Sequence, residues 1–125
     1  MWKYAFGRSP KPSKSKYEFK IIYPYNERKK ESTKILRKYP NMVPIIIEKS
    51  DRSEIEDIDK HNYIFKKSAI FGYVMKVVRK KLELDSSTSL YFYINNKTVP
   101  KVHDKLGDLY KKYRDKDLFL YITYT

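Results

Sequence analysis

The segment DLFLYITYT at residues 117–125, where the sequence ends, is apolar on both faces if it forms a strand. Successive side chains of a strand point to opposite faces of its sheet. The apolar side chains of the two faces are Leu118, Leu120 and Ile122 on one, and Phe119 and Tyr121 on the other. A strand of this kind usually lies at the centre of a sheet. We therefore expect this segment to be an inner strand.

The other segments have either helical or strand-like patterns. Residues 25–38 carry a narrow apolar stripe at helical spacing, and Pro40 ends this helix at or before Tyr39. Apolar residues recur at helical spacing over 68–82, and a short helix is expected over 104–113. The strand-like segments, rich in β-branched and aromatic residues, are 42–49, 62–66, 89–95 and 117–125.

In chain order, these elements are a helix, two strands, a helix, a strand, a short helix and a strand. A main helix that crosses a four-strand mixed sheet is the α+β layout of a ubiquitin-like β-grasp domain, here with an additional N-terminal helical segment. We expect one such domain at 17–125, because 125 residues suffice for a single core. Residues 1–16 have five basic and no acidic residues, and predict a flexible basic arm.

The segment KYPNMVPIIIEKS at 38–50 places three isoleucines after a proline. Isoleucine favours a strand, whereas proline cannot donate a hydrogen bond to a sheet and is confined to strand starts and sheet edges. The segment therefore predicts an edge strand whose backbone is left open to a partner.

Composition excludes several classes of protein. The absence of cysteine removes disulfide scaffolds, cysteine zinc sites and thiol nucleophiles. No apolar run approaches the length of a membrane span, and nothing resembles a signal peptide. His61 and His103 are far apart in sequence and belong to no cluster at metal-ligand spacing. We expect no metal site, no cofactor and no catalytic constellation, and hence no enzyme.

A set of ordered motifs resembles the ubiquitin-like autophagy modifiers of the GABARAP and light-chain-3 type. The motifs are YPYNER (23–28), RKYPNMVPIIIEK (37–49), DIDKHNYIF (57–65), VVRKKLEL (77–84), LYFYINN (90–96) and DLYKKYRDKDLFLYITY (108–124). The similarity runs from about Phe19 to Thr125, which is most of the chain.

This resemblance implies a monomeric, non-enzymatic modifier of the cytoplasm. Family conjugation enzymes attach such proteins through a C-terminal glycine to phosphatidylethanolamine in the autophagosomal membrane. They then recruit cargo receptors and autophagy adaptors that carry a short aromatic-x-x-aliphatic motif, which is expected to bind as an added β-strand.

The resemblance also assigns residues to the peptide site, position by position. It places an aromatic pocket at Glu31, Ile35, Pro44, Ile46, Lys60, Ile64 and Phe119. It places an aliphatic pocket at Tyr63, Phe65, Val74 and Val77. The strand that accepts the peptide would be 42–49, with pairing at Val43, Ile45, Ile47, Glu48 and Lys49. Arg79 and Lys81 would attract acidic residues that flank the motif.

Several positions depart from the family pattern and affect the expected peptide preference. Met42 replaces an arginine that holds acidic groups, and Asn62 replaces a lysine at the pocket rim. Lys66 and Ala69 stand where the family has proline and a larger apolar residue. The last glycine is Gly107, so the chain as given is not expected to be conjugated. Either the chain is trimmed or it is a divergent member that is never lipid-linked.

Two other hypotheses remain at this point. A net charge of +13 and thirteen tyrosines are compatible with a protein that binds nucleic acid or an anionic surface. Such a protein would bind through 1–16 and the lysine-rich helix. The third hypothesis is a ubiquitin-like protein that is conjugated to another protein rather than to lipid.

Overall fold

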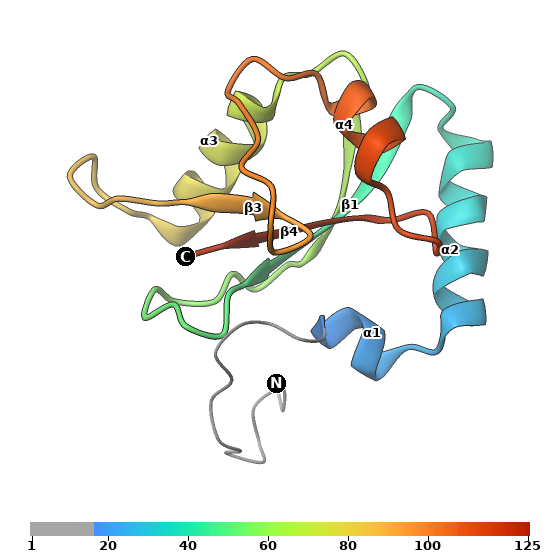
Figure 1. Ribbon diagram of the computed structural model, residues 1–125, viewed down its shortest axis with the longest axis horizontal. Helices are drawn as coiled ribbons and strands as arrows, with labels where there is room; N and C mark the ends of the chain where they lie inside the picture. Colours follow the sequence, from blue (N-terminus) through green and yellow to red (C-terminus); the bar gives the residue numbers. More distant parts are fainter. Residues whose placement is uncertain (1–16) are drawn as a thin grey trace.

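The computed structural model describes residues 17–125, so the predicted arm at 1–16 lies outside the described residues (Figure 1). The helices are α1 (Glu18–Ile22), α2 (Tyr25–Lys38), α3 (Phe71–Leu82) and α4 (Leu106–Tyr113). The strands are β1 (Met42–Lys49), β2 (Asn62–Lys66), β3 (Phe92–Ile94) and β4 (Leu120–Tyr124). None of the helices in 17–125 is long and apolar enough to cross a bilayer.

The four strands form one mixed sheet in the order β2-β1-β4-β3. The inner strands β1 and β4 run parallel to each other, and each pairs antiparallel with an outer strand, β2 or β3. All five residues of β4 are buried, because helices cover both faces of the sheet there. The prediction that the end of the chain is an inner strand is confirmed, as is the α+β ubiquitin-like fold.

The prediction that residues 42–49 form an open edge strand is wrong. β1 pairs with β2 on one side, from Met42↔Lys66 to Ile46↔Asn62, and with β4 on the other. Because β1 lies between β2 and β4, it is an inner strand and not an edge strand. The residues assigned to strand pairing are therefore inner-strand residues, namely Val43, Ile45, Ile47, Glu48 and Lys49.

Pro44 marks the start of a ladder instead of an edge. It stands opposite Ile64 of β2, but the pairing with β4 begins one residue later, at Ile45↔Leu120. A proline just before a ladder begins leaves no inter-strand hydrogen bond unmade. A proline in a strand-like segment is therefore compatible either with an edge strand or with the start of a ladder in an inner strand, and this fold has the second arrangement.

The two faces of the sheet carry separate apolar clusters. On one face, α3 and α4 pack on β1 and β4 through buried residues that include Phe71, Val74, Val78, Leu106, Ile45, Ile47, Leu120 and Ile122. The opposite face carries a smaller cluster of Tyr17, Ile46, Phe119 and Tyr121, against which Phe19 and Ile35 pack. This division follows from the two-residue period of strands, which sends Ile45 and Ile46 to opposite faces.

Two helices begin later than predicted, and one helix is not foreseen. Ile70 and Lys105 form an isolated antiparallel bridge, which holds the residues before α3 and α4 in an extended conformation. The backbone N–H of Phe71 donates to Asp104 O, and that of Leu106 donates to Ala69 O. The short α1 has five residues, too few for a helix that is stable alone, so contacts with the sheet must hold it.

Candidate functional site

A groove of about 680 Å³ lies where α1, α2, the edge of β2 and the start of β4 meet. Its lining residues are Phe19, Tyr23, Glu27, Arg28, Glu31, Lys34, Ile35, Lys38, Tyr39, Lys60, Asn62, Tyr63, Ile64 and Phe119. Five of them belong to the predicted aromatic pocket: Glu31, Ile35, Lys60, Ile64 and Phe119. The groove thus brings together side chains from α2, β2 and the segment before β4.

The other two residues of the predicted aromatic pocket, Pro44 and Ile46, lie beneath this groove. Both are buried, and Ile46 packs in the same cluster as Phe119 and Ile35. They support the apolar part of the groove without lining it. Phe19 of α1 also lines the groove, with its ring centroid 5.1 Å from that of Phe119 in an edge-on arrangement. Sequence patterns do not reveal this contribution, because α1 has too few residues to show a period.

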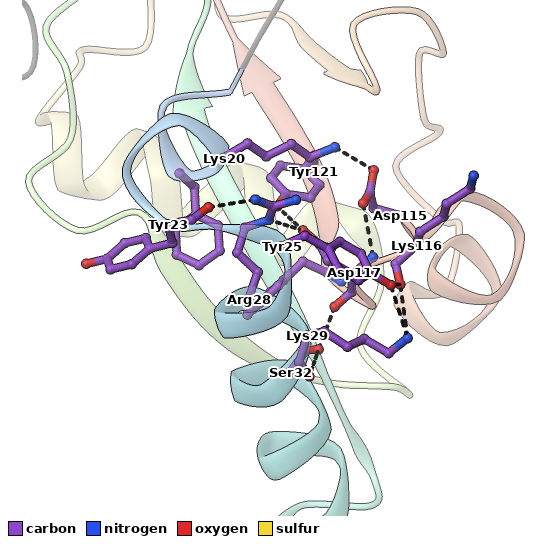
Figure 2. Close-up of polar contacts among 12 residues, drawn as sticks. Lys20, Tyr23, Tyr25, Arg28, Lys29, Ser32, Asp115, Lys116, Asp117 and Tyr121 are labelled. Carbon is purple, nitrogen blue, oxygen red and sulfur yellow. Dashed lines mark hydrogen bonds and ion pairs between the residues drawn. The ribbon is translucent and has the colours of Figure 1, made fainter.

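A buried polar network fixes α2 against the sheet (Figure 2). The Nε atom of Arg28 donates to Asp117 Oδ2 at 2.7 Å, and both side chains are almost completely buried. The hydroxyl of Tyr121 donates to the same carboxylate oxygen, and Ser32 Oγ donates to the backbone carbonyl of Asp117. Burial and the hydrogen bond to Asp117 raise the pKa of Tyr121 well above its ordinary value. Because Asp117 accepts bonds from α2 and β4, the position of α2 beside the groove is fixed.

A second set of polar contacts fixes α1. The carboxylate of Glu48 accepts hydrogen bonds from the backbone N–H groups of Glu18 and Phe19, at 2.9 and 2.8 Å. The ammonium of Lys20 lies 2.6 Å from Asp115 Oδ1. Burial alone would raise the pKa of Asp115, but hydrogen bonds from Lys20 and from Asp117 N–H outweigh it and lower that pKa. Glu48, expected as a strand-pairing residue, therefore uses its side chain to cap α1.

The outer edge of β2 has no partner strand among residues 17–125. Ile47 N donates to His61 O, and Lys67 N donates to Asn41 O. In an antiparallel ladder every second residue makes such bonds, so residues 61, 63, 65 and 67 face β1. The backbone groups of Asn62, Ile64 and Lys66 consequently face outward. Ile64 is 37% exposed and borders the groove.

The four residues of the predicted aliphatic pocket belong to the core cluster on the α3 side of β2, and Tyr63 also lines the groove. Tyr63 and Phe65 stack with ring centroids 5.6 Å apart, whereas Val74 is fully buried and Val77 partly buried. This region is closed by its own packing. Burial, together with the charge of Asp59, raises the pKa of Tyr63 to about 12.

The predicted contacts for acidic flanks do not line this groove. Arg79 lies on α3, and its Nη1 donates to the backbone carbonyls of Asp85 and Thr88. Lys81 is exposed on the same helix. Near the groove, His61 Nε2 lies 3.0 Å from Asp57 Oδ1, a pair at i,i+4 spacing that is not among the predicted site residues. Within 17–125, no three histidine or carboxylate side chains are grouped as a metal site.

Comparisons with known proteins agree with this architecture. Residues 27–125 match the family described as autophagy protein Atg8, ubiquitin like. The crystal structure of Trypanosoma brucei ATG8 is similar, with 29% sequence identity and a TM-score of 0.83, over 89% of this chain and 95% of that chain. Plasmodium falciparum Atg8 in complex with a Plasmodium falciparum Atg3 peptide has 28% identity and a TM-score of 0.76, over 86% and 94% of the two chains. With the family match extending over most of the sequence, the chain belongs to the Atg8 ubiquitin-like autophagy proteins.

Proposed function

We propose that this chain recruits cargo receptors and autophagy adaptors by binding aromatic-x-x-aliphatic peptides as a strand added to β2. The observation that carries the proposal is the groove beside the outer edge of β2, which has no partner strand in 17–125, with Ile64 belonging to both. The outward backbone groups of Asn62, Ile64 and Lys66 would pair with the peptide. The added strand thus lies on β2 and not on β1, to which the sequence pattern pointed.

The aromatic side chain of the peptide would enter the groove between α2 and β2. There it meets Ile35, Ile64 and Phe119, with Ile46 beneath them. Burial of one such side chain contributes roughly 1.5–3 kcal/mol before the cost of ordering the peptide. Glu31 and Lys60 at the groove would orient polar groups near the ring.

The aliphatic side chain of the peptide would bind between β2 and α3, where Phe65, Val74 and Val77 are packed together. Because Val74 is fully buried, these side chains must move apart to admit a guest. We propose that the aromatic residue docks in a preformed groove and that the aliphatic pocket opens on binding.

The relative from Plasmodium falciparum supports a peptide-binding role, since it was solved with a peptide of Atg3. We extend this to the present chain and propose that peptides of its conjugation enzymes use the same edge of β2. Attachment to phosphatidylethanolamine through a C-terminal glycine completes the proposal. The last glycine of the sequence is Gly107 in α4, so mass spectrometry of the C-terminus of the native protein tests this part.

The groove is tested by titrating the isotope-labelled chain with a synthetic aromatic-x-x-aliphatic peptide. We expect amide shifts at Asn62, Ile64 and Lys66, together with shifts at Ile35 and Phe119. Shifts confined to other surfaces would overturn the proposal.

A matched pair of variants separates the groove from general surface effects. Ile64→Glu should weaken peptide binding by at least about tenfold, because it places an unpaired charge beside an apolar groove. Val99→Glu is the control: Val99 is also an exposed apolar residue, at 66%, but lies in the loop after β3. Equal losses in the two variants would show that the added charge, and not the groove, controls binding.

A further inference from the structure

A second concave surface lies on a different flank of α2 from the groove. This cavity of about 520 Å³ is formed by the start of α2, the end of α4 and the loop before β4. It is lined by Tyr25, Lys29, Lys111, Arg114, Asp115, Lys116 and Leu118. None of these residues lines the groove proposed for peptides. We refer to it as the basic cavity.

Four of the seven lining residues are cations, against one carboxylate. That carboxylate, Asp115, is already engaged: it receives the ammonium of Lys20 at 2.6 Å and the backbone N–H of Asp117 at 3.1 Å. Its negative charge is therefore largely compensated from outside the cavity. The field inside the basic cavity is set by Lys29, Lys111, Arg114 and Lys116.

The cations at and after the end of α4 have no acidic partner in the described part of the chain. No carboxylate among residues 17–125 forms an ion pair with Lys111, Arg114 or Lys116. Residues 1–16 contain no aspartate or glutamate that could supply one. Gathering like charges without partners disfavours the folded state through repulsion. Arg114 lies over the ring of Tyr110, at 5.7 Å from its centroid, but no carboxylate balances its charge. A cluster of cations that internal carboxylates do not neutralise points to an external anion.

Direct contacts hold the two walls of this cavity together (Figure 2). The hydroxyl of Tyr25 donates to Lys116 O at 3.2 Å, and Lys29 Nζ lies 3.4 Å from both the Tyr25 hydroxyl and Lys116 O. These bonds join the first turn of α2 to the loop after α4. The backbone segments that carry the cations are therefore held in place before a ligand binds, which lowers the free-energy cost of ordering the site on binding.

We propose that the basic cavity binds a compact polyol carrying clustered phosphates, as in a phosphoinositide headgroup or a free inositol phosphate. The guanidinium of Arg114 suits a phosphate because it presents paired N–H donors, and the three lysines add point charges around it. A volume of about 520 Å³ is in the range of small-ligand sites. An adjoining hollow shares Tyr25 and Lys29 with the basic cavity and continues along α2 to Lys38. An extended nucleic-acid strand is therefore the competing occupant, and the oligonucleotide described below tests it.

The test is a titration of the full chain with inositol trisphosphate near physiological ionic strength, followed by amide shifts. We expect saturable shifts at Lys29, Lys111 and Arg114, with the groove residue Ile64 unchanged. A parallel arm measures binding to phosphatidylcholine vesicles that contain either phosphatidylinositol bisphosphate or phosphatidylserine at equal surface charge. Binding to the first vesicle alone identifies a membrane headgroup as the source; binding to inositol trisphosphate without vesicle binding identifies the free compound.

Two triple variants with the same net charge decide whether the site is specific. Lys111→Gln/Arg114→Gln/Lys116→Gln should weaken inositol trisphosphate binding by at least about tenfold, since it removes charged hydrogen bonds. Lys76→Gln/Lys80→Gln/Lys97→Gln removes three exposed cations from α3 and the loop after β3, and should leave binding unchanged. Thermal unfolding and peptide binding confirm that both variants fold.

Equal losses in the two triple variants would overturn the proposal, because they would show attraction by net charge alone. A single-stranded oligonucleotide that binds more tightly than inositol trisphosphate, with shifts extending along α2 to Arg37 and Lys38, would also overturn it. Neither outcome bears on peptide binding in the groove, so the proposal for the basic cavity and the proposed peptide-binding function can fail independently of each other.

Discussion

The two faces of the sheet are covered by different means. On the α3 face, buried aliphatic and aromatic side chains such as Phe71, Val74 and Ile122 form a continuous core. On the α2 face the apolar cluster is small, and the helices are held by polar contacts centred on Asp117 and Glu48. Apolar contacts have no direction, whereas the polar contacts fix α1 and α2 at defined positions.

This difference explains why one of the two proposed peptide pockets is open and the other is closed. On the α2 face, polar contacts at the base of the helix hold it beside the sheet and leave a groove between them. On the α3 face, close packing fills the space, and Val74 is fully buried. Binding to an open groove with fixed walls costs little free energy for ordering the protein. Binding to a closed pocket also costs the free energy of opening that pocket.

The largest expected effect comes from Asp117→Ala, which removes the carboxylate shared by Arg28 and Tyr121. The variant leaves a buried guanidinium without its partner, and we expect a loss of about 3–5 kcal/mol in the free energy of unfolding. Chemical denaturation measures it, with Asp108→Ala, an exposed acid of α4, as the control. A loss no greater than that of the control would show that apolar packing holds α2 and would remove the contrast between the faces.

Val74→Ala tests the closed pocket on the other face. It removes two buried methyl groups and should lower the free energy of unfolding by about 2 kcal/mol. If the aliphatic pocket must open for the peptide, the smaller side chain lowers the cost of opening, and affinity for a peptide with a bulky aliphatic residue should not fall. Calorimetric titration checks the affinity. A large loss would mean that Val74 contacts the peptide directly in an already open pocket.

The helices, strands and inner position of β4 were predictable because their patterns are local. The alternation in 117–125 and the helical spacing in 68–82 each depend on burial of one stretch of chain. The aromatic pocket residues came from the family resemblance, and five of the seven line the groove. Tertiary contacts explain the shifted starts of α3 and α4, since the bridge between Ile70 and Lys105 joins distant segments.

The wrong prediction for β1 and the failure to predict α1 both arise because local sequence patterns do not specify contacts between distant segments. Pro44 restricts its own hydrogen bonding but does not say whether a ladder lies before or after it, so its pattern fits an edge or a ladder start. The polar contacts that hold α1 and α2 join residues 29, 30, 89 and 95 positions apart. The local periodicity of apolar residues, which predicts helices and strands, contains no information about such distant pairs. The face of the molecule built from polar contacts was therefore harder to predict than the apolar face.

Tyr63→Phe examines a polar atom on the apolar face. The Tyr63 hydroxyl is buried and has no hydrogen-bond partner among the described residues, so its removal should stabilise the fold by about 1 kcal/mol. The folded pKa of about 12 exceeds the ordinary 10.0, so the titration of Tyr63 costs no stability below pH 10.0, and the free energy of unfolding falls as the pH rises from 10.0 through 12. Unfolding curves across that range should fall less steeply for the variant. A destabilised variant would reveal a bond to the hydroxyl.

Lys20→Met tests the weakest of the polar contacts, because it keeps the side-chain stem and removes the charge beside Asp115. Both side chains are about one-quarter exposed, so we expect a loss of less than about 1 kcal/mol near neutral pH. Asp115 has a folded pKa below 3.8, so its contribution is present above pH 3.8 and is lost as the pH falls through the folded value. The difference between Lys20→Met and the parent chain should therefore shrink in acid, as measured by denaturation at several pH values. If this difference in the free energy of unfolding stays constant with pH, Lys20 acts through its contacts with the rings of Tyr17 and Tyr121 and not through Asp115. The polar contacts that hold α1 would then be those of Glu48.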